Sequence, residues 1–99
     1  RVMPKLSKAK RGKNRWIGLS VTNSPISRSE LRQLLDSGLQ GTDWKLYDYE
    51  EDVSQGTAIV RVMLEDVSVA LERINSIKGL STVTTSGKIR LVRERLSLV

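Results

Sequence analysis

Basic side chains are concentrated at the two ends of this 99-residue chain. Residues 1–15 contain seven lysines and arginines and no acid, and residues 88–95 contain four against one glutamate. The segment 16–87 has ten acidic and six basic residues, a net of −4, so the net of +6 for the whole chain comes from +7 at the start and +3 at the end. Clustered cations attract polyanions, because each neutralised phosphate releases condensed counterions. The pattern predicts phosphate-binding ends, and the alternative is a pair of solubilising, unstructured ends.

Other chemistry has little support in the residue types. The chain has no cysteine and no histidine, which removes thiolate ligands, disulfides and the usual general base. The acidic side chains Asp48, Glu50, Glu51 and Asp52 suggest a divalent-metal cluster, but such a run is ordinarily a solvated turn and nothing else completes a site. No serine has a histidine partner, and the phosphate-binding glycine motifs are absent. We therefore expect no catalytic and no metal-binding residues.

Six elements are expected to position the basic ends. Alternating apolar residues predict strands at 16–21, 44–49, 57–64 and 80–85. Ser27 and Glu30 have the spacing of a capping box, which starts a helix that we expect to stop at Gly38. A second helix is predicted over 65–78, with Gly79 ending it. Its core-facing residues recur at helical spacing and are Val67, Ala70, Leu71, Ile74 and Ile77.

This order of elements predicts an α+β fold, a ferredoxin-like (RRM-like) βαββαβ sandwich. It has a four-stranded antiparallel sheet with two helices on one face. Residues 1–14 are expected to form a basic disordered N-terminal tail, and residues 15–99 a single domain. The start of the first strand should lie beside the end of the fourth strand. The two basic ends of the chain are therefore expected to meet at one edge of the sheet.

The last residues favour a short basic C-terminal helix that begins after Ser86 and Gly87. Its apolar residues, Ile89, Val92, Leu96 and Val99, have helical spacing. A helix start offers unpaired amides to a phosphate oxygen. The apolar side of this helix is expected to cover the sheet face that the other two helices leave bare, over residues drawn from Ile59, Met63, Tyr47 and Tyr49.

Aromatic residues are few and poorly placed for reading bases. RRM domains stack single-stranded bases on aromatic residues of their middle strands. Here the predicted third strand, 57–64, has no aromatic residue, and the chain has no phenylalanine. Trp16 and Trp44 are expected to fill the ends of the core, and Tyr47 and Tyr49 to pack in the core or against a partner. The composition favours recognition of the nucleic-acid backbone over base stacking.

No apolar stretch approaches the ~20 residues of a membrane span, and no signal-peptide pattern is present. A basic leader without Arg- and Ser-rich amphipathic spacing is also a poor fit to a transit peptide. We expect a cytoplasmic protein with no membrane partner.

Three segments resemble one family, the archaeal ribonuclease P protein component 2 family. They are Lys13-Asn-Arg-Trp-Ile-Gly18, Gly56-Thr-Ala-Ile-Val-Arg61 and Val83-Thr-Thr-Ser-Gly-Lys-Ile-Arg90. The likeness covers about residues 13–96, and its most specific part is Ser86-Gly87 ahead of Ile89-Arg90. The chain departs from the family pattern at Lys88, where threonine is usual.

The resemblance implies a non-catalytic subunit of the ribonucleoprotein that removes the 5′ leader of precursor tRNA. In that particle the RNA is the catalyst, and Mg²⁺ is bound by the RNA rather than by the protein. The implied partners are ribonuclease P RNA and the barrel-shaped protein component 3, with precursor tRNA contacted indirectly. No cofactor is expected on the protein itself.

The residues expected to contact RNA phosphates come from both ends of the chain. They are Lys10, Arg11, Lys13, Asn14, Arg15, Ser86, Gly87, Lys88, Arg90 and Arg93. Two alternatives stay open: a ribosomal or other structural RNA-binding protein, and a ferredoxin-like regulatory domain that binds a small molecule.

Overall fold

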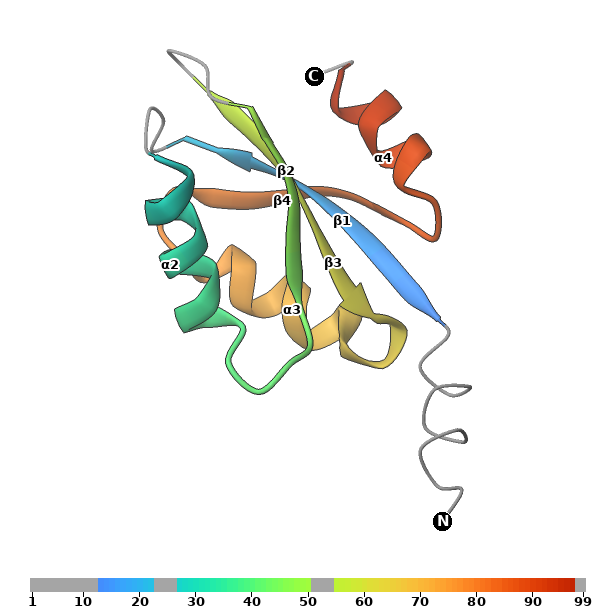
Figure 1. The fold of residues 1–99 in the computed structure, drawn as a ribbon, viewed down its shortest axis with the longest axis horizontal. Helices are drawn as coiled ribbons and strands as arrows, with labels where there is room; N and C mark the ends of the chain where they lie inside the picture. The colour runs from blue at the N-terminus through green and yellow to red at the C-terminus, as the bar shows by residue number, and fades with distance from the viewer. Residues whose placement is uncertain (1–12, 23–26, 51–54, 98–99) are drawn as a thin grey trace.

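A computed structural model describes residues 13–22, 27–50 and 55–97. In this part of the chain a four-stranded antiparallel sheet separates two helices on one side from one helix on the other (Figure 1). The strands are β1 (Asn14–Val21), β2 (Lys45–Glu50), β3 (Gly56–Met63) and β4 (Leu80–Ser86). The helices are α2 (Arg28–Gly38), α3 (Val67–Asn75) and α4 (Ile89–Leu96), with a 3₁₀ turn, η1 (Leu64–Asp66), before α3.

The strand order is β2-β3-β1-β4, and all neighbouring strands are antiparallel. The predicted α+β architecture of the ferredoxin-like type is therefore confirmed, together with its two-helix layer and its C-terminal helix. β1 lies at the centre between β3 and β4. Its first residues pair with the last residues of β4, as in the pair Trp16 and Ser86. The expected meeting of the start of the first strand with the end of the fourth is thus confirmed.

Both ends of α2 follow the prediction. Ser27 Oγ accepts a hydrogen bond from the Glu30 amide, and the Glu30 carboxylate accepts one from the Ser27 amide, which completes the capping box. The helix ends at Gly38, as predicted, and Leu39 is its C-cap. Gly38 does not have the positive φ of a typical glycine stop, and it serves packing instead. A Cβ on Gly38 would lie 2.7 Å from Ile77 Cδ1. This glycine lets α2 approach the residues that follow α3.

The second helix begins later than its sequence pattern suggests. Leu64, the last residue of the predicted third strand, instead begins η1 and is 42% exposed. η1 turns the chain before α3 starts, so the buried alternation of β3 ends at Val62 and Met63. Gly79 has a φ of 92°, a conformation that glycine adopts without strain, but α3 ends at Asn75, earlier than the predicted stop at Gly79.

A β-bulge at Tyr47 in the edge strand β2 changes which face of the sheet the side chains after it point to. Leu46 pairs with Val60 and Asp48 pairs with Ile59, which leaves Tyr47 as the extra residue. Alternation alone put Tyr47 and Tyr49 on one face. The bulge separates them, and Tyr49 packs against the main core instead. A bulge has no signature in this stretch, so strand periodicity predicted the wrong face for Tyr49.

The sheet has a hydrophobic cluster on each face. The main core, thirteen buried residues from all four strands and from α2 and α3, lies under these two helices. On the other face α4 packs Val92 and Leu96 against Ile59, and Trp16 lies at the margin of this cluster. The predicted role of α4 as a cover for the bare face is confirmed for Ile59. Gly18 makes this possible, because a Cβ there would lie 2.8 Å from Val92 Cγ1.

Several predictions fall on residues outside the described ranges. They include the N-terminal tail up to residue 12, the acidic segment 51–54 and the last apolar residue of the C-terminal helix, Val99. Among the described helices, none is long and apolar enough to cross a membrane.

Candidate nucleic-acid interface

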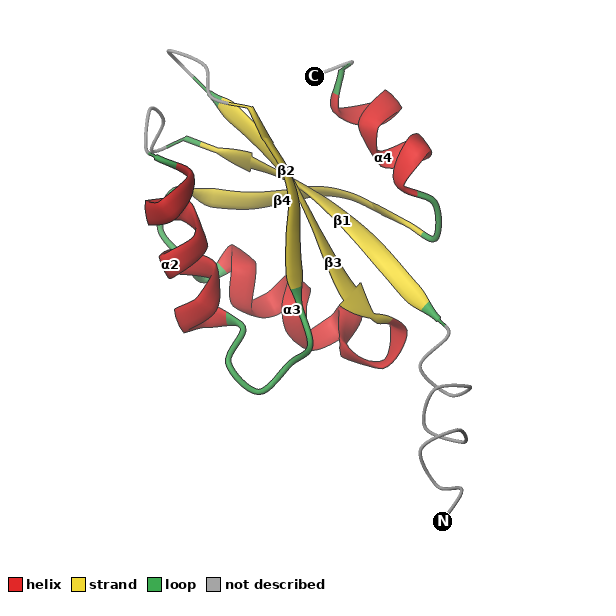
Figure 2. Ribbon diagram, viewed as in Figure 1, coloured by secondary structure: helices red, strands yellow, loops and turns green. Residues whose placement is uncertain are grey.

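The start of β1 and the turn between β4 and α4 lie side by side at one end of the sheet (Figure 2). Trp16 and Ser86 are opposite each other in the ladder. Lys13 immediately precedes β1, and its carbonyl accepts a hydrogen bond from the Leu64 amide at the end of β3. Pairing with the end of β3 therefore fixes the backbone from which Lys13, Asn14 and Arg15 project, and pairing with β4 begins at Trp16.

Arg15 reaches across to the turn that follows β4. A Cβ built on Gly87 would lie 3.2 Å from Arg15 Nη1 and 3.6 Å from its Cζ. The same Nη1 donates a hydrogen bond to the Asn14 carbonyl at 2.9 Å. The guanidinium is therefore held against the turn backbone, and a side chain at position 87 would crowd it. Glycine keeps one cation close to backbone that approaches a ligand easily.

The turn leads directly into α4. The Lys88 amide donates to Ser86 Oγ at 3.2 Å, and the Lys88 carbonyl accepts the amides of Leu91 and Val92. Lys88 occupies the N-cap and makes no side-chain hydrogen bond to the first turn. The first turn contains Arg90, which is exposed. Amides at a helix start, together with nearby cations, are the groups that bind phosphate oxygens.

We call this surface the cationic edge. Its residues are Lys13, Asn14, Arg15, Ser86, Gly87, Lys88 and Arg90. Within the described ranges, none of its four cations forms an ion pair with a carboxylate. Glu65 and Asp66 follow β3 at the same end, but they lead into α3 in the two-helix layer. Polyanion binding is therefore favoured on the side of the sheet that carries α4.

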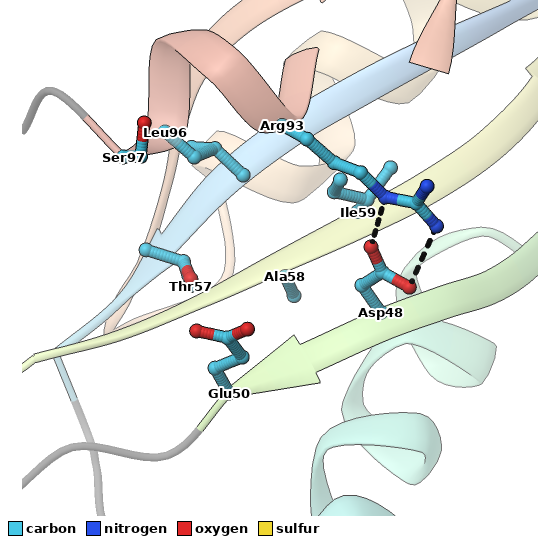
Figure 3. A pocket seen from close by; sticks show the side chains of 8 residues that line it. All are labelled: Asp48, Glu50, Thr57, Ala58, Ile59, Arg93, Leu96 and Ser97. Atoms are coloured by element: carbon cyan, nitrogen blue, oxygen red, sulfur yellow. Dashed lines mark hydrogen bonds and ion pairs between the residues drawn. The ribbon is translucent and has the colours of Figure 1, made fainter. Parts of the chain in front are cut away.

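Arg93 does not belong to the cationic edge. Its Nε donates to Asp48 Oδ2 at 2.8 Å, and its Nη2 donates to Oδ1 at 3.3 Å (Figure 3). The hydrogen bond to Asp48 and then the negative charge of that carboxylate raise the pKa of Arg93 above its ordinary value. The pair joins α4 to β2 beside a groove of about 250 Å³, which Glu50 and Leu96 also line. Two further residues that were predicted to contact RNA phosphates, Lys10 and Arg11, lie outside the described residues.

Sequence reasoning missed three features on the same side of the sheet. Arg95 Nη1 donates to Thr84 Oγ1 at 2.9 Å, which ties α4 to β4. Trp16 and Tyr47 form an edge-to-face pair with ring centroids 4.6 Å apart. Lys45 Nζ lies 5.4 Å from the centroid of the Tyr47 ring. The Arg95 and Trp16 contacts join residues that are distant in the sequence, and both Tyr47 contacts involve the bulge residue, so strand periodicity contains no signal for them.

No group of three or more acidic residues in the described part of the chain is arranged to hold a metal ion. The acids Glu51 and Asp52 of the considered cluster fall outside the described ranges. The polar chemistry that the described residues bring together is cationic, from the cationic edge across to Lys45.

Comparison with known proteins gives a likeness of fold. The sequence matches no family model and no curated protein. A crystal structure of the cytoplasmic N-terminal domain of subunit I of V-ATPase, a homologue of subunit a, is similar with a TM-score of 0.50 and 21% identity. The match covers 94% of this chain and 34% of that one, so this chain spans about a third of its length. At this identity the likeness shows the fold alone.

Proposed function

We propose that the domain binds structured RNA through the phosphates that meet its cationic edge. The observation that carries this proposal is the contact between Arg15 and Gly87, which joins the two basic ends of the described chain at one surface. Lys13, Lys88 and Arg90 are exposed around it. Phosphates need cations and backbone amides rather than a deep pocket, and this edge supplies both groups.

We further propose that the RNA is that of ribonuclease P and that the domain acts as a non-catalytic subunit. The support is the sequence resemblance, whose most specific segment includes Ser86, Gly87 and Arg90 of the cationic edge. The protein would hold the folded RNA in its active form, while Mg²⁺ bound by that RNA activates the attacking water. The barrel-shaped component 3 is the protein partner expected in this assembly.

Reconstitution tests this proposal. The full chain is added to catalytic ribonuclease P RNA, with and without component 3, and cleavage of the 5′ leader from precursor tRNA is measured. We expect the chain to raise cleavage at Mg²⁺ concentrations where the RNA alone is slow. No change in cleavage, combined with tighter binding to ribosomal RNA, would contradict the ribonuclease P assignment and favour the ribosomal alternative.

The salt dependence of binding tests the phosphate contacts themselves. About six neutralised phosphates predict that the logarithm of the affinity falls with the logarithm of the salt concentration at a slope near −5. Fluorescence anisotropy of labelled RNA over a salt series measures this slope. A slope near zero, or a gain in stability with a small metabolite and none with RNA, would favour the regulatory-domain alternative.

A further inference from the structure

One row of residues crosses the whole sheet next to the cationic edge. Ser86 of β4 pairs with Trp16 of β1, Trp16 pairs with Arg61 of β3, and Arg61 pairs with Lys45 of β2. Directly opposed residues project to the same face, and three strand spacings make the row about 14 Å long. The face is the one that carries α4, because Trp16 packs at the margin of the α4 cluster. The row begins at a residue of the cationic edge.

Two aromatic rings lie at the middle of this row and are partly exposed to solvent. One is Trp16 of the row itself, and the other is Tyr47, the extra residue of the β2 bulge. Trp16 of β1 and Tyr47 of β2 meet above β3, the strand between them, with their ring planes at 89°. Tyr47 is 37% exposed, although a large aromatic ring gains by being buried. We call Trp16, Tyr47, Arg61 and Lys45 the aromatic row. β3 has no aromatic residue of its own. Its two neighbouring strands, β1 and β2, each supply one of the two rings.

Cations flank the two rings. Lys45 Nζ lies over the Tyr47 ring, and Arg61 lies between Trp16 and Lys45 in the ladder. Arg61 Nε is buried without a hydrogen-bond partner in the described part of the chain, and its contact with Asp43 is a long 3.5 Å. Asp48, which lies in β2 next to Tyr47, is held by Arg93. The surroundings of the rings therefore favour an anionic ligand.

We propose that the aromatic row binds an unpaired nucleotide of the RNA, with its base stacked on the Trp16–Tyr47 pair. The proposal rests on the proposed function, because the adjoining phosphates would lie on the cationic edge and on Lys45 and Arg61. An unpaired nucleotide has a base with a π face, and a negatively charged phosphodiester precedes and follows it in the strand. These groups match the two aromatic rings and the cations that flank them. An apolar protein surface would match the rings but would offer no negative charge to Lys45 and to the Nε of Arg61. The domain then contacts both the backbone and one base of its RNA.

Tryptophan fluorescence isolates the stacking step. The chain has two tryptophans, so the variant Trp44→Phe leaves Trp16 as the single reporter. The full chain is titrated with a short single-stranded oligoadenylate and with an RNA duplex of equal phosphate number. We expect the oligoadenylate to quench Trp16 emission and the duplex to bind without quenching. Tyr47→Ala should weaken oligoadenylate binding by about 5- to 150-fold, the range for one stacked base, and leave duplex binding unchanged.

Tyr47→Phe is the matched control, because it keeps the ring and should bind the oligoadenylate like the parent. Unchanged Trp16 emission, or an equal loss of both RNAs in Tyr47→Ala, would overturn the stacking site. In that case salt-dependent duplex binding would persist, and the proposed function would stand. Absence of any salt-dependent RNA binding would overturn both proposals. Quenching by component 3 and not by RNA would assign the row to a protein interface and overturn the base site.

Discussion

The two faces of the sheet are covered to different extents. On one face α2 and α3 close a core of thirteen buried residues drawn from every strand. On the other face α4 buries Ile59, Val92 and Leu96 and leaves the aromatic row at its margin. A domain of this size has room for one main hydrophobic core. We infer that the first face supplies most of the stability and that the second face is available for binding.

Truncating one leucine on each face gives the largest effect and tests this difference directly. Leu35→Ala in the main core should lower the free energy of unfolding by about 2–5 kcal/mol, because Leu35 is fully buried. Leu96→Ala removes the same atoms from the smaller cluster, where the site can collapse more easily, and should cost less. Urea denaturation followed by circular dichroism measures both. Equal losses would contradict the assignment of stability to the two-helix face.

A methyl group at Gly18 tests how closely α4 packs on the sheet. A Cβ there would lie 2.8 Å from Val92 Cγ1 and 3.2 Å from Leu96 Cδ1. Gly18→Ala should therefore destabilise the domain by about 1–3 kcal/mol through overpacking. Val92→Ala removes the clashing methyl group, so the double variant should lose less than the sum of the two single variants. Strict additivity in urea denaturation would mean that α4 does not rest on Gly18.

The ion pair between α4 and β2 should give the smallest effect. Asp48→Asn keeps the shape of the side chain and removes the charge that holds Arg93. Both partners are partly exposed, so water and salt screen the pair. We expect a small drop in the thermal midpoint at low salt, and a smaller one at high salt. Arg93→Gln should add nothing further in the Asp48→Asn background, and a further drop there would show that Arg93 has another structural role.

Local signals predicted the elements well. The capping box at Ser27 and Glu30, the helical stripe before Gly79 and the alternation of β1 are short-range patterns, and each predicted the kind of element that formed. The bounds differ for two of them, because α3 is shorter than expected and β1 begins earlier. The errors arose where tertiary contacts decide. The β-bulge moved Tyr49 to the core side, and Leu64 turns into η1 instead of continuing β3.

The candidate site could be predicted only in part. Strand order brought Arg15 to Gly87, because the topology itself pairs the start of β1 with the end of β4. The charge count could not show that Arg93 has an intramolecular partner in Asp48. Nor could it show that Trp16 and Tyr47 meet over β3, since they belong to strands that do not pair with each other.

Paired charge removal tests the central claim most directly. Lys88→Gln with Arg90→Gln removes two exposed cations from the cationic edge, and Arg28→Gln with Arg32→Gln removes two exposed cations from α2. The affinity of each double variant for ribonuclease P RNA is measured over a salt series. We predict weaker binding and a salt slope shallower by about 2 for the first pair, and wild-type values for the second. Equal losses in both pairs, or a loss in the α2 pair alone, would contradict binding at the cationic edge.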